Sequence, residues 1–325
     1  MSRVVVIGGS GHVGGYLIPA LVEGGHAVVN VSRGQAAPYR PHAAWDRVER
    51  VVADREAEAP ESFAARIAAL GADVVIDMIS FDLAATRPLV EALRGRIAHF
   101  LHCSTIWVYG HNPAVPATED DPMNPFGDYG TKKAEIETWL LADARRTGFP
   151  ATIFRPGHIV GTGWAPLNPA GHFDPEVFAT IARGEVLDLP NFGLETVHHV
   201  HAEDVAQVIL NSMTHRGAAL GEAFNAVSPQ ALNLRGYAEA MFRWFGHAPR
   251  LTFAPFDDWK SRQTAANAGA TWEHIARSPA HSVEKARRRL GYVPRHSSLG
   301  AVQESVAALI AAGTLEIPAR GWAAD

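Results

Sequence analysis

The sequence predicts an α/β protein in which a doubly wound parallel sheet carries a smaller, mostly helical lobe. Three observations predict this fold. Strand-like and helical patterns alternate through the first half of the chain, a cluster of glycines directly follows the first strand pattern, and the second half becomes loop-like and helical after Gly161. Alternating strands and helices form parallel sheets covered on both faces, and such sheets bind ligands at the carboxyl ends of their strands.

Six short runs rich in β-branched and apolar residues are typical of buried strands. They cover residues 3–7, 27–31, 51–53, 73–77, 99–103 and 151–154. Helical patterns lie between them at 12–23, 61–70, 83–94 and 129–147, and further ones follow at 175–183, 202–213, 234–244, 282–290 and 299–312. We therefore expect residues 1–161, with returning segments at about 194–228, to form the sheet domain. Residues 162–193 and 229–325 are expected to form a substrate-binding lobe.

The composition limits the class of protein. Apolar residues make up 47% of the 325-residue chain and charged residues 19%, as is usual for a globular protein, and the net charge of −5 argues against a nucleic-acid binder. Cys103 is the one cysteine, which excludes an intramolecular disulfide and a multi-cysteine metal site. No run approaches the roughly 18 apolar residues of a membrane span, and the first residues lack a signal-peptide pattern. We expect a cytoplasmic protein with neither membrane nor nucleic-acid partners.

The glycine cluster has the spacing of a dinucleotide-binding loop. Gly9-x-Gly11-x-x-Gly14 overlaps Gly8-x-x-Gly11-x-x-Gly14. Such glycines permit a tight turn, close approach of the backbone to a pyrophosphate, and close packing of the next helix, whose amino terminus then faces the phosphates. Because the cluster follows a strand pattern and precedes a helical one, it predicts a Rossmann-type domain. The alternative is a glycine-rich turn without a ligand.

The end of the second strand bears on which dinucleotide binds. Ser32 stands at the position where NAD-binding units carry a carboxylate, and Arg33 follows it. A hydroxyl and a guanidinium suit a 2′-phosphate, which a carboxylate would repel. The sequence therefore favours NADP over NAD. Alternatively, Arg33 stacks on the adenine or lies in solvent.

Tyr129 and Lys133 are four residues apart in a helical pattern and so share a helix face. An ammonium near a phenol favours the phenolate, which would lower the tyrosine pKa from its usual value near 10. Tyr129 could then exchange a proton with a substrate oxygen. Ser104 and Thr105 directly follow the fifth strand pattern, where a hydroxyl could hydrogen-bond the same oxygen; the alternative for both is ordinary turn chemistry.

Several motifs in order resemble the extended short-chain dehydrogenase/reductase group, and specifically the NAD-dependent epimerase/dehydratase family. The matching segments are 8–14 (GGSGHVG), 104–110 (STIWVYG), 129–133 (YGTKK), 155–161 (RPGHIVG), 199–206 (HVHAEDVA), 282–286 (SVEKA) and 290–294 (LGYVP). They extend over nearly the whole chain. The resemblance implies a Rossmann-type fold, an NAD(P) cofactor and hydride transfer on a sugar-like substrate. It also implies a homodimer, for which the helices at 83–94 and 129–147 could supply a four-helix interface.

The resemblance assigns roles to individual positions. Thr105 stands where the family has its catalytic Ser or Thr, Tyr129 would be the acid/base, and Lys133 would bind the nicotinamide ribose and lower the pKa of Tyr129. Asp54 falls where the family contacts the adenine, and Pro156 would lie near the nicotinamide. The expected cofactor-binding residues are Gly8, Gly11, His12, Val13, Gly14, Ser32, Arg33, Asp54, Met78, Ser80, Tyr129, Lys133 and Pro156.

Departures from the family pattern narrow the range of reactions and substrates that we expect. Ile106 and Trp107 occupy the positions of the Asp-Glu pair of 4,6-dehydratases, so that elimination is not expected. UDP-sugar 4-epimerases hold the diphosphate with an Asn where this chain has His158, and with an Arg where it has Val197. A nucleotide sugar is therefore doubtful, although His158 or Arg183 could substitute. A free sugar, a polyol or another hydroxy/keto compound becomes credible.

The histidines of 195–201 (ETVHHVH) do not predict a metal site. His199 and His201 can share a strand face, but no carboxylate or cysteine completes a ligand set, so no metal is expected. An aromatic wall for a sugar ring could comprise Trp107, Tyr109, Trp164 and Phe192, unless several of them are core residues. The side chains expected at the substrate are Ser80, Thr105, Trp107, His158 and His201.

Two functions remain open from the sequence. The first is an NAD(P)-dependent sugar epimerase or oxidoreductase. The second is a non-catalytic dinucleotide-sensing or RNA-associated protein, because some relatives resembling chloroplast stem-loop RNA-binding proteins keep the fold with altered catalysis. Retention of Thr105, Tyr129 and Lys133, together with the negative net charge, favours the enzyme.

Overall fold

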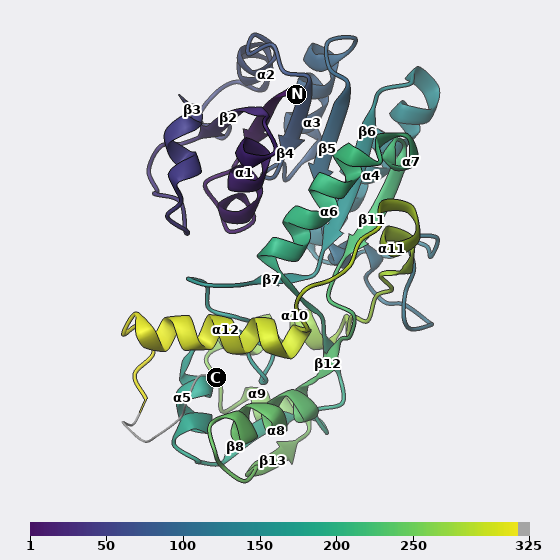
Figure 1. Ribbon diagram of the computed structural model, residues 1–325. Helices are drawn as coiled ribbons and strands as arrows, with labels where there is room; N and C mark the ends of the chain where they lie inside the picture. Colours follow the sequence, from purple (N-terminus) through teal and green to yellow (C-terminus); the bar gives the residue numbers. More distant parts are fainter. Residues whose placement is uncertain (318–325) are drawn as a thin grey trace.

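The computed structural model describes residues 1–317 and confirms the predicted doubly wound α/β fold (Figure 1). Seven parallel strands form one sheet in the order β11-β6-β5-β4-β1-β2-β3. They are β1 (Arg3–Ile7), β2 (Ala27–Ser32), β3 (Glu49–Val52), β4 (Val74–Asp77), β5 (His99–Cys103), β6 (Ala151–Pro156) and β11 (Glu222–Ala226). The chain reverses its direction of strand addition after β3, so a crevice opens between β1 and β4, where such folds bind ligands.

Helices cover both faces of the sheet, because successive side chains of each strand point to opposite sides. In β1, Val4 and Val6 pack into one core, whereas Val5 and Ile7 pack into another. The first core includes α1 (Gly14–Glu23), α6 (Ala202–Thr214) and the short helix η1 (Ala43–Arg47); the second includes α2 (Pro60–Ala68), α3 (Leu83–Leu93) and α4 (Asp128–Thr147). The side chains of β1 therefore pack alternately against the helices on the two faces, and the sheet forms the middle of three layers.

The smaller lobe lies beyond the carboxyl ends of the strands and has a core of its own (Figure 1). Its helices are α5 (Glu176–Ala182), α8 (Leu234–Trp244), α9 (Phe256–Lys260), α10 (Ala265–Ile275) and α12 (Ser298–Ala311). Short strand pairs accompany them, namely β8 (Leu187–Pro190) with β13 (Leu251–Ala254), β9 (Thr196–Val197) with β12 (Leu232–Asn233), and β7 (His158–Val160) with β10 (His199–His201). β7 follows β6 after one residue, so it links the sheet directly to the lobe.

One helix departs from the predicted division of the chain. α11 (Glu284–Leu290) falls in the segment assigned to the lobe, but Ala286 and Leu290 pack in the same core as Phe224 of β11. The hydroxyl of Tyr292 donates to the carbonyl of Val227 at 2.9 Å. α11 and the short α7 (Arg216–Ala219) therefore lie with the sheet. No helix among residues 1–317 is long and apolar enough to cross a membrane.

Candidate active site

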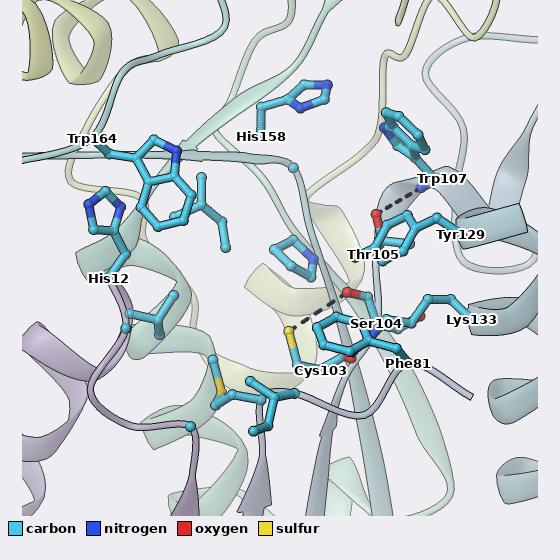
Figure 2. Close-up of a pocket in the computed structure, with 18 of the residues that line it drawn as sticks. His12, Phe81, Cys103, Ser104, Thr105, Trp107, Tyr129, Lys133, His158 and Trp164 are labelled. Atoms are coloured by element: carbon cyan, nitrogen blue, oxygen red, sulfur yellow. Dashed lines mark hydrogen bonds between the residues drawn. The ribbon is translucent and has the colours of Figure 1, made fainter. Parts of the chain in front are cut away.

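A cavity of about 590 Å³ opens at the carboxyl ends of β1, β4, β5 and β6 (Figure 2). Of the predicted site residues, it brings together Gly8, Gly11, His12, Val13, Gly14, Met78, Thr105, Trp107, Tyr129, Lys133, Pro156 and His158. The lobe closes its other side with Trp164, Phe173 and residues of α10. Segments far apart in the sequence thus contribute to one open cavity between the sheet and the lobe.

The glycine loop leaves β1 in a turn that depends on its glycines. Gly8 has a φ of +84°, in the left-handed region that favours glycine. A Cβ on Gly14 would lie 1.8 Å from the carbonyl oxygen of Gly9, so only glycine lets α1 begin this close to the loop. α1 starts at Gly14, two residues later than predicted, and its amino terminus borders the cavity. Unpaired amides and the helix dipole favour an anion there.

A second cavity, of about 480 Å³, lies at the ends of β2 and β3. Arg33 and Asp54 line it, and Ile79 and Phe81 line both cavities, so the two are neighbours. Ser32 is not among its lining residues; its hydroxyl accepts a hydrogen bond from the Gly34 amide at 3.3 Å. The predicted adenosine-side residues thus gather near one cavity, with Ser32 at its margin.

An ion pair that the sequence analysis missed supports this second cavity. Arg55 Nη1 lies 2.8 Å from each carboxylate oxygen of Asp77, and Arg55 Nη2 donates to the carbonyl of Ala85 at 3.1 Å. Both side chains are buried. The pair holds the loop after β3 against the end of β4 and the start of α3. A carboxylate inside the apolar strand β4 was the available signal, because a buried charge requires a partner.

Thr105, Tyr129 and Lys133 lie together in the first cavity (Figure 2). Lys133 is 1% exposed, and its Nζ donates to the carbonyl oxygens of Ser80 at 2.6 Å and Cys103 at 2.7 Å. These bonds fix the ammonium at the ends of β4 and β5. The hydroxyl of Thr105 accepts from the amide of Trp107 at 3.2 Å at the start of the short helix η2 (Ile106–Tyr109), and the Thr105 side chain lies beside that of Tyr129 (Figure 2).

The protonation of Tyr129 differs from the expectation. Burial raises the pKa of Tyr129 above its usual value near 10, although the neighbouring Thr105 hydroxyl acts in the opposite direction. Burial also lowers the pKa of Lys133. The Lys133 ammonium lies 5.8 Å from the centroid of the Tyr129 ring and is directed at two carbonyl oxygens. The expected lowering of the tyrosine pKa is therefore outweighed by desolvation of the phenolate.

Ser104 is occupied elsewhere, which leaves Thr105 as the hydroxyl beside Tyr129. The Ser104 hydroxyl donates to the carboxylate of Glu137, which is fully buried. Glu137 in turn accepts two hydrogen bonds from Arg155 at its Oε2, from Nε at 3.0 Å and from Nη2 at 2.7 Å. This network was not foreseen, although an Arg in β6 and a Glu on the inner face of α4 were visible in the sequence.

Aromatic and imidazole rings line the end of the cavity beyond Tyr129. The ring centroid of Trp107 lies 5.8 Å from that of Tyr129 and 5.3 Å from that of His274. His158 lies 4.7 Å from His274, and Phe173 lies 5.5 Å from His274. Burial lowers the pKa of His274 to about 4 and that of His158 well below its usual value, so both are neutral at pH 7. α10, which supplies Glu273 and His274, was not predicted; its one clear signal was Thr264, which caps it.

Arg277 lies behind this end of the cavity, where two aromatic rings and an acid hold its guanidinium. The guanidinium carbon of Arg277 lies 3.8 Å from the ring centroids of both Trp107 and Phe126. Its Nη1 lies 2.5 Å from a carboxylate oxygen of Glu273, and its Nη2 donates to the Phe126 carbonyl at 2.6 Å. Arg277 therefore supports Trp107 from behind rather than presenting a charge to a ligand.

Four of the residues expected near the substrate lie elsewhere. The hydroxyl of Ser80 hydrogen-bonds Thr86, and only its carbonyl reaches the site, through Lys133. His201 stacks on His296 with ring centroids 3.7 Å apart and is not among the lining residues. Tyr109 is fully buried, and Phe192 is 74% exposed and outside the cavity. Tertiary packing determines where these four side chains lie, and a strand or loop pattern in the sequence does not predict such packing.

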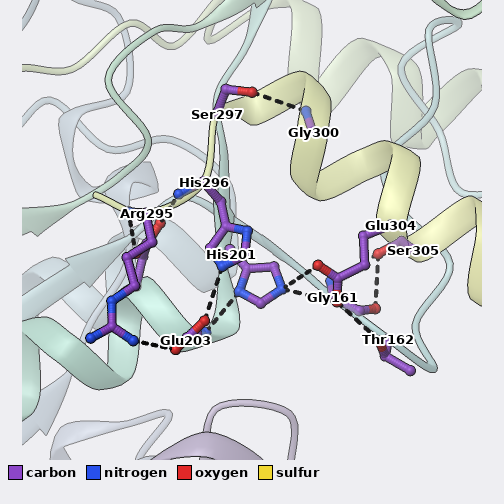
Figure 3. A network of polar contacts seen from close by, with 11 residues as sticks. Gly161, Thr162, His201, Glu203, Arg295, His296, Ser297, Gly300, Glu304 and Ser305 are labelled. Atoms are coloured by element: carbon purple, nitrogen blue, oxygen red, sulfur yellow. Dashed lines mark hydrogen bonds and ion pairs between the residues drawn. The ribbon is translucent and has the colours of Figure 1, made fainter. Parts of the chain in front are cut away.

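His201, Glu203 and His296 place ligand atoms within 4.8 Å of one another, but hydrogen bonds already occupy these groups (Figure 3). His201 Nδ1 accepts from the Glu203 amide at 3.1 Å, while its Nε2 faces Glu304 at 3.3 Å. The Glu203 carboxylate pairs with Arg295 at 2.5 Å and with His296 at 3.0 Å. The arrangement is that of an ion-pair network at the junction between α6 and α12.

A comparison with protein families classifies the chain. The model of the NAD dependent epimerase/dehydratase family matches residues 4–226, which include the glycine loop, the Thr-Tyr-Lys group and β11. The chain belongs to this family. It is thus an NAD-dependent enzyme of the extended short-chain dehydrogenase/reductase type, as the resemblance implied.

Proteins similar to this chain have names that give different activities. The UDP-glucose 4-epimerase of Corynebacterium glutamicum is 25% identical over 95% of this chain and 96% of its own. The 2'-dehydrokanamycin reductase of Streptomyces kanamyceticus is 28% identical over 80% of this chain and 71% of its own. The chloroplast stem-loop binding protein of 41 kDa b of Arabidopsis thaliana is 26% identical over 73% of this chain but only 62% of its own. Epimerases and reductases therefore both occur among its relatives.

The residues present fit the dinucleotide that the family implies. A Cβ on Gly14 would collide with the backbone of Gly9, and a Cβ on Gly9 would lie within 3 Å of the side chains of Ile18 and Asn30, so the loop is tightly packed at both glycines. The amino terminus of α1 borders the cavity. His12, in the same loop, is 6% exposed, and neither of its ring nitrogens has a hydrogen-bond partner among residues 1–317. A loop that keeps a buried donor and acceptor unpaired beside a helix terminus suits an anionic ligand.

Proposed function

We propose that the chain is an NAD(P)-dependent oxidoreductase or epimerase that acts at a hydroxyl- or keto-bearing carbon of a sugar-like substrate. The observation that carries this proposal is that Thr105, Tyr129 and the fixed ammonium of Lys133 line one cavity together with the glycine loop. Two hydroxyls and one cation at the carboxyl edge of the sheet can hold one substrate oxygen and exchange its proton.

The roles of the side chains follow from their contacts. A bound nicotinamide would accept the hydride from the substrate carbon or return it. In the oxidative direction Tyr129 removes the hydroxyl proton; in the reductive direction it supplies that proton to the keto oxygen. Thr105 donates a hydrogen bond to the same oxygen in the second case and so stabilises the negative charge that develops there. Burial raises the pKa of Tyr129, and a protonated phenol can supply the proton that reduction of a ketone requires.

The fate of the ketone distinguishes the two activities. In an epimerase the ketone stays bound and is reduced again on its other face, whereas in a dehydrogenase or reductase it leaves or arrives as a separate molecule. Denaturing the purified protein and identifying any released dinucleotide tests this. Tightly held oxidised cofactor supports an epimerase, and an empty site that binds added NADPH or NADH supports a reductase or dehydrogenase.

The proposal includes a preference for NADP over NAD. Arg33 is exposed at the end of β2 and lines the adenosine-side cavity, with Ser32 beside it in place of a carboxylate. A guanidinium there can pair with a 2′-phosphate. NAD remains the alternative, since Asp54 and Glu58 line the same cavity.

The proposal further excludes a nucleotide diphosphate from the substrate. Such a group carries two negative charges and needs cationic partners. Among the residues that line the cavity, Lys133 is committed to two carbonyl oxygens, the imidazoles of His158 and His274 are neutral, and Glu273 is an acid. Arg277 lies behind Trp107. Rings such as Trp107 and Phe173 instead suit the apolar face of a free or glycosidic sugar ring.

The similarity to a chloroplast stem-loop binding protein favours one other candidate, a dinucleotide-sensing or RNA-associated protein. Tyr129→Phe separates the two. In the enzyme, this change abolishes NADPH oxidation with a panel of keto sugars but spares binding of NADPH. If wild-type protein turns over no member of the panel yet binds a stem-loop RNA, the enzyme assignment fails.

The proposal also covers location and assembly. We expect a cytoplasmic homodimer built on α3 and α4, which lie side by side; Arg94 Nη2 of the first lies 3.0 Å from a carboxylate oxygen of Asp143 on the second. Analytical ultracentrifugation tests the dimer, and a monomer at all concentrations would overturn it.

A further inference from the structure

His12 is the buried polar side chain of the glycine loop whose contacts the catalytic proposal does not use. Its imidazole contacts the rings of Tyr39 and Trp164, with centroids 4.5 Å and 4.0 Å away, and the Trp164 contact is visible in Figure 2. The side chain is 6% exposed, and both ring nitrogens lack a partner among residues 1–317. An unpaired buried polar atom costs about 1–3 kcal/mol, so an imidazole with two such atoms suggests that a ligand satisfies one of them.

The position of His12 indicates which ligand. His12 lines the first cavity between Gly11 and Val13, directly before the ten-residue helix α1. The amino terminus of a helix attracts anions, and the glycine loop permits a close approach of phosphate oxygens. The imidazole, the loop and the helix terminus therefore border the same part of the cavity, opposite the end that holds Tyr129.

We propose that the imidazole of His12 binds the diphosphate of the dinucleotide and takes up a proton when it does so. The inference rests on the dinucleotide of the proposed function, but not on the substrate or the direction of hydride transfer. The proton comes from solvent, and the protonated ring donates a hydrogen bond to a phosphate oxygen. His12 would thus be a binding residue that couples cofactor affinity to pH.

The surroundings of His12 make it neutral before the ligand arrives. Burial, and to a smaller extent the nearby His201, lower the pKa of His12 to about 4. The other groups on this side are Tyr39 and Trp164, which contact the ring, and Tyr16, which lies 5.2 Å from His201 and beneath Arg40. Glu304, an acid that acts on Tyr16, already faces His201 at 3.3 Å. No carboxylate is left beside His12 in the described structure to stabilise an imidazolium.

A diphosphate would reverse this balance. It brings two negative charges and accepts a hydrogen bond, and both favour the charged form of a neighbouring imidazole. Binding at pH 7 should therefore draw close to one proton onto His12, and affinity should improve as the pH falls.

The test is calorimetric titration of the full chain with NADH, which lacks the separately titrating 2′-phosphate, in buffers of different ionisation enthalpy at pH 7. We expect uptake of close to one proton in wild type and an affinity that weakens by up to about tenfold per pH unit between pH 6 and 8. In His12→Phe, whose ring can still pack against Tyr39 and Trp164, we expect no uptake and a flat pH profile. His42→Asn, an exposed histidine whose capping role Asn can take over, should behave as wild type.

The outcomes distinguish this inference from the proposed function. Equal proton uptake in wild type and His12→Phe, or binding without uptake in wild type, overturns the role of His12 and leaves the enzyme proposal in place. Failure of wild type to bind NADH or NADPH at any pH overturns the proposed function itself. If His12→Phe does not fold, His12→Gln serves instead: its neutral amide can donate to phosphate but cannot gain a proton, so the expected uptake is again zero.

Discussion

Arg155 and Glu137 form a buried ion pair behind the turn that carries Thr105. Arg155 Nη2 lies 2.7 Å from Glu137 Oε2, and the two side chains are 3% and 0% exposed. Arg155 Nη1 also donates to the hydroxyl of Tyr109 at 2.6 Å, and that hydroxyl donates to Asn225 at 2.8 Å. The pair therefore connects α4, β6, β11 and the turn after β5, which are the elements that position the proposed acid/base group.

Replacing Glu137 should destabilise the protein strongly. Glu137→Gln leaves the charge of Arg155 buried without a counter-charge, and breaking such a pair costs about 3–5 kcal/mol. Denaturant unfolding measures the change in the free energy of unfolding. Asp128→Asn on the same helix removes the exposed pair with Lys132, 2.9 Å apart, and should cost less than about 1 kcal/mol. Equal losses in the two variants would contradict the structural role given to the buried pair.

Thr105 and Ser104 should respond differently to removal of their hydroxyls. Thr105→Val removes a hydrogen bond to the reacting oxygen, so kcat should fall about 10²–10³-fold, and the lost cap on the Trp107 amide should cost about 0.5–2 kcal/mol of stability. Ser104→Ala leaves Glu137 without one donor and should mainly lower stability, by about 1–3 kcal/mol. Steady-state kinetics with a sugar that wild type turns over, together with thermal unfolding, measures both. A larger loss of kcat in Ser104→Ala than in Thr105→Val would reverse the assignment.

Local patterns predicted the sheet well because its central strands are buried on both faces and bounded by turn residues. Each of the six predicted strands ends within two residues of its observed position. The spacing of the motifs likewise predicted that Thr105, Tyr129 and Lys133 share one site, and all three line the same cavity. These are cases in which neighbouring residues in the sequence determine the geometry.

The rest depends on contacts between distant segments. α10 contains Asn267 and Gly269, which weaken a helical pattern, so its Glu273 and His274 were missed as pocket residues. The hydroxyl of Ser80 turns to Thr86 and the ring of His201 turns to His296 because of packing partners far along the chain. The raised pKa of Tyr129 likewise results from burial by the assembled site, which no spacing rule reports.

Arg33 should decide the choice of dinucleotide. Arg33→Ser removes a charge-assisted partner of the 2′-phosphate, which is worth about 1.5–3 kcal/mol. NADPH should then bind about 10–150-fold more weakly, while the Kd of NADH stays unchanged. Fluorescence titration with both dinucleotides measures the difference. Arg40→Ser is the matched control, because Arg40 lies on the same loop but its guanidinium lies 4.2 Å from the ring centroid of Tyr16. If Arg33→Ser weakens the binding of NADH and NADPH equally, Arg33 does not bind the 2′-phosphate.

Stability should fall steeply as the solution is acidified below pH 6.5. Burial lowers the pKa to about 4 for six histidines, namely His12, His99, His172, His198, His199 and His274. It lowers the pKa well below the usual value for three more, namely His102, His158 and His281. The unfolded chain binds protons at these groups near pH 6.5 and the folded chain does not, so the stabilisation is complete above pH 6.5 and is lost as the pH falls towards 4. Each histidine contributes up to about 1.4 kcal/mol per pH unit in that window.

Denaturant unfolding between pH 4.5 and 8 measures this slope, from which the number of protons taken up on unfolding follows. His102 is the sharpest single test, because it is fully buried in β5 and neither ring nitrogen has a partner among residues 1–317. His102→Leu should reduce the uptake below pH 6 by about one proton and leave stability at pH 8 nearly unchanged or improved. His111→Gln, at an exposed histidine that stacks on Phe126, should leave the slope as in wild type. A free energy of unfolding that is independent of pH between 5 and 6.5 would show that these histidines are not held neutral by the fold.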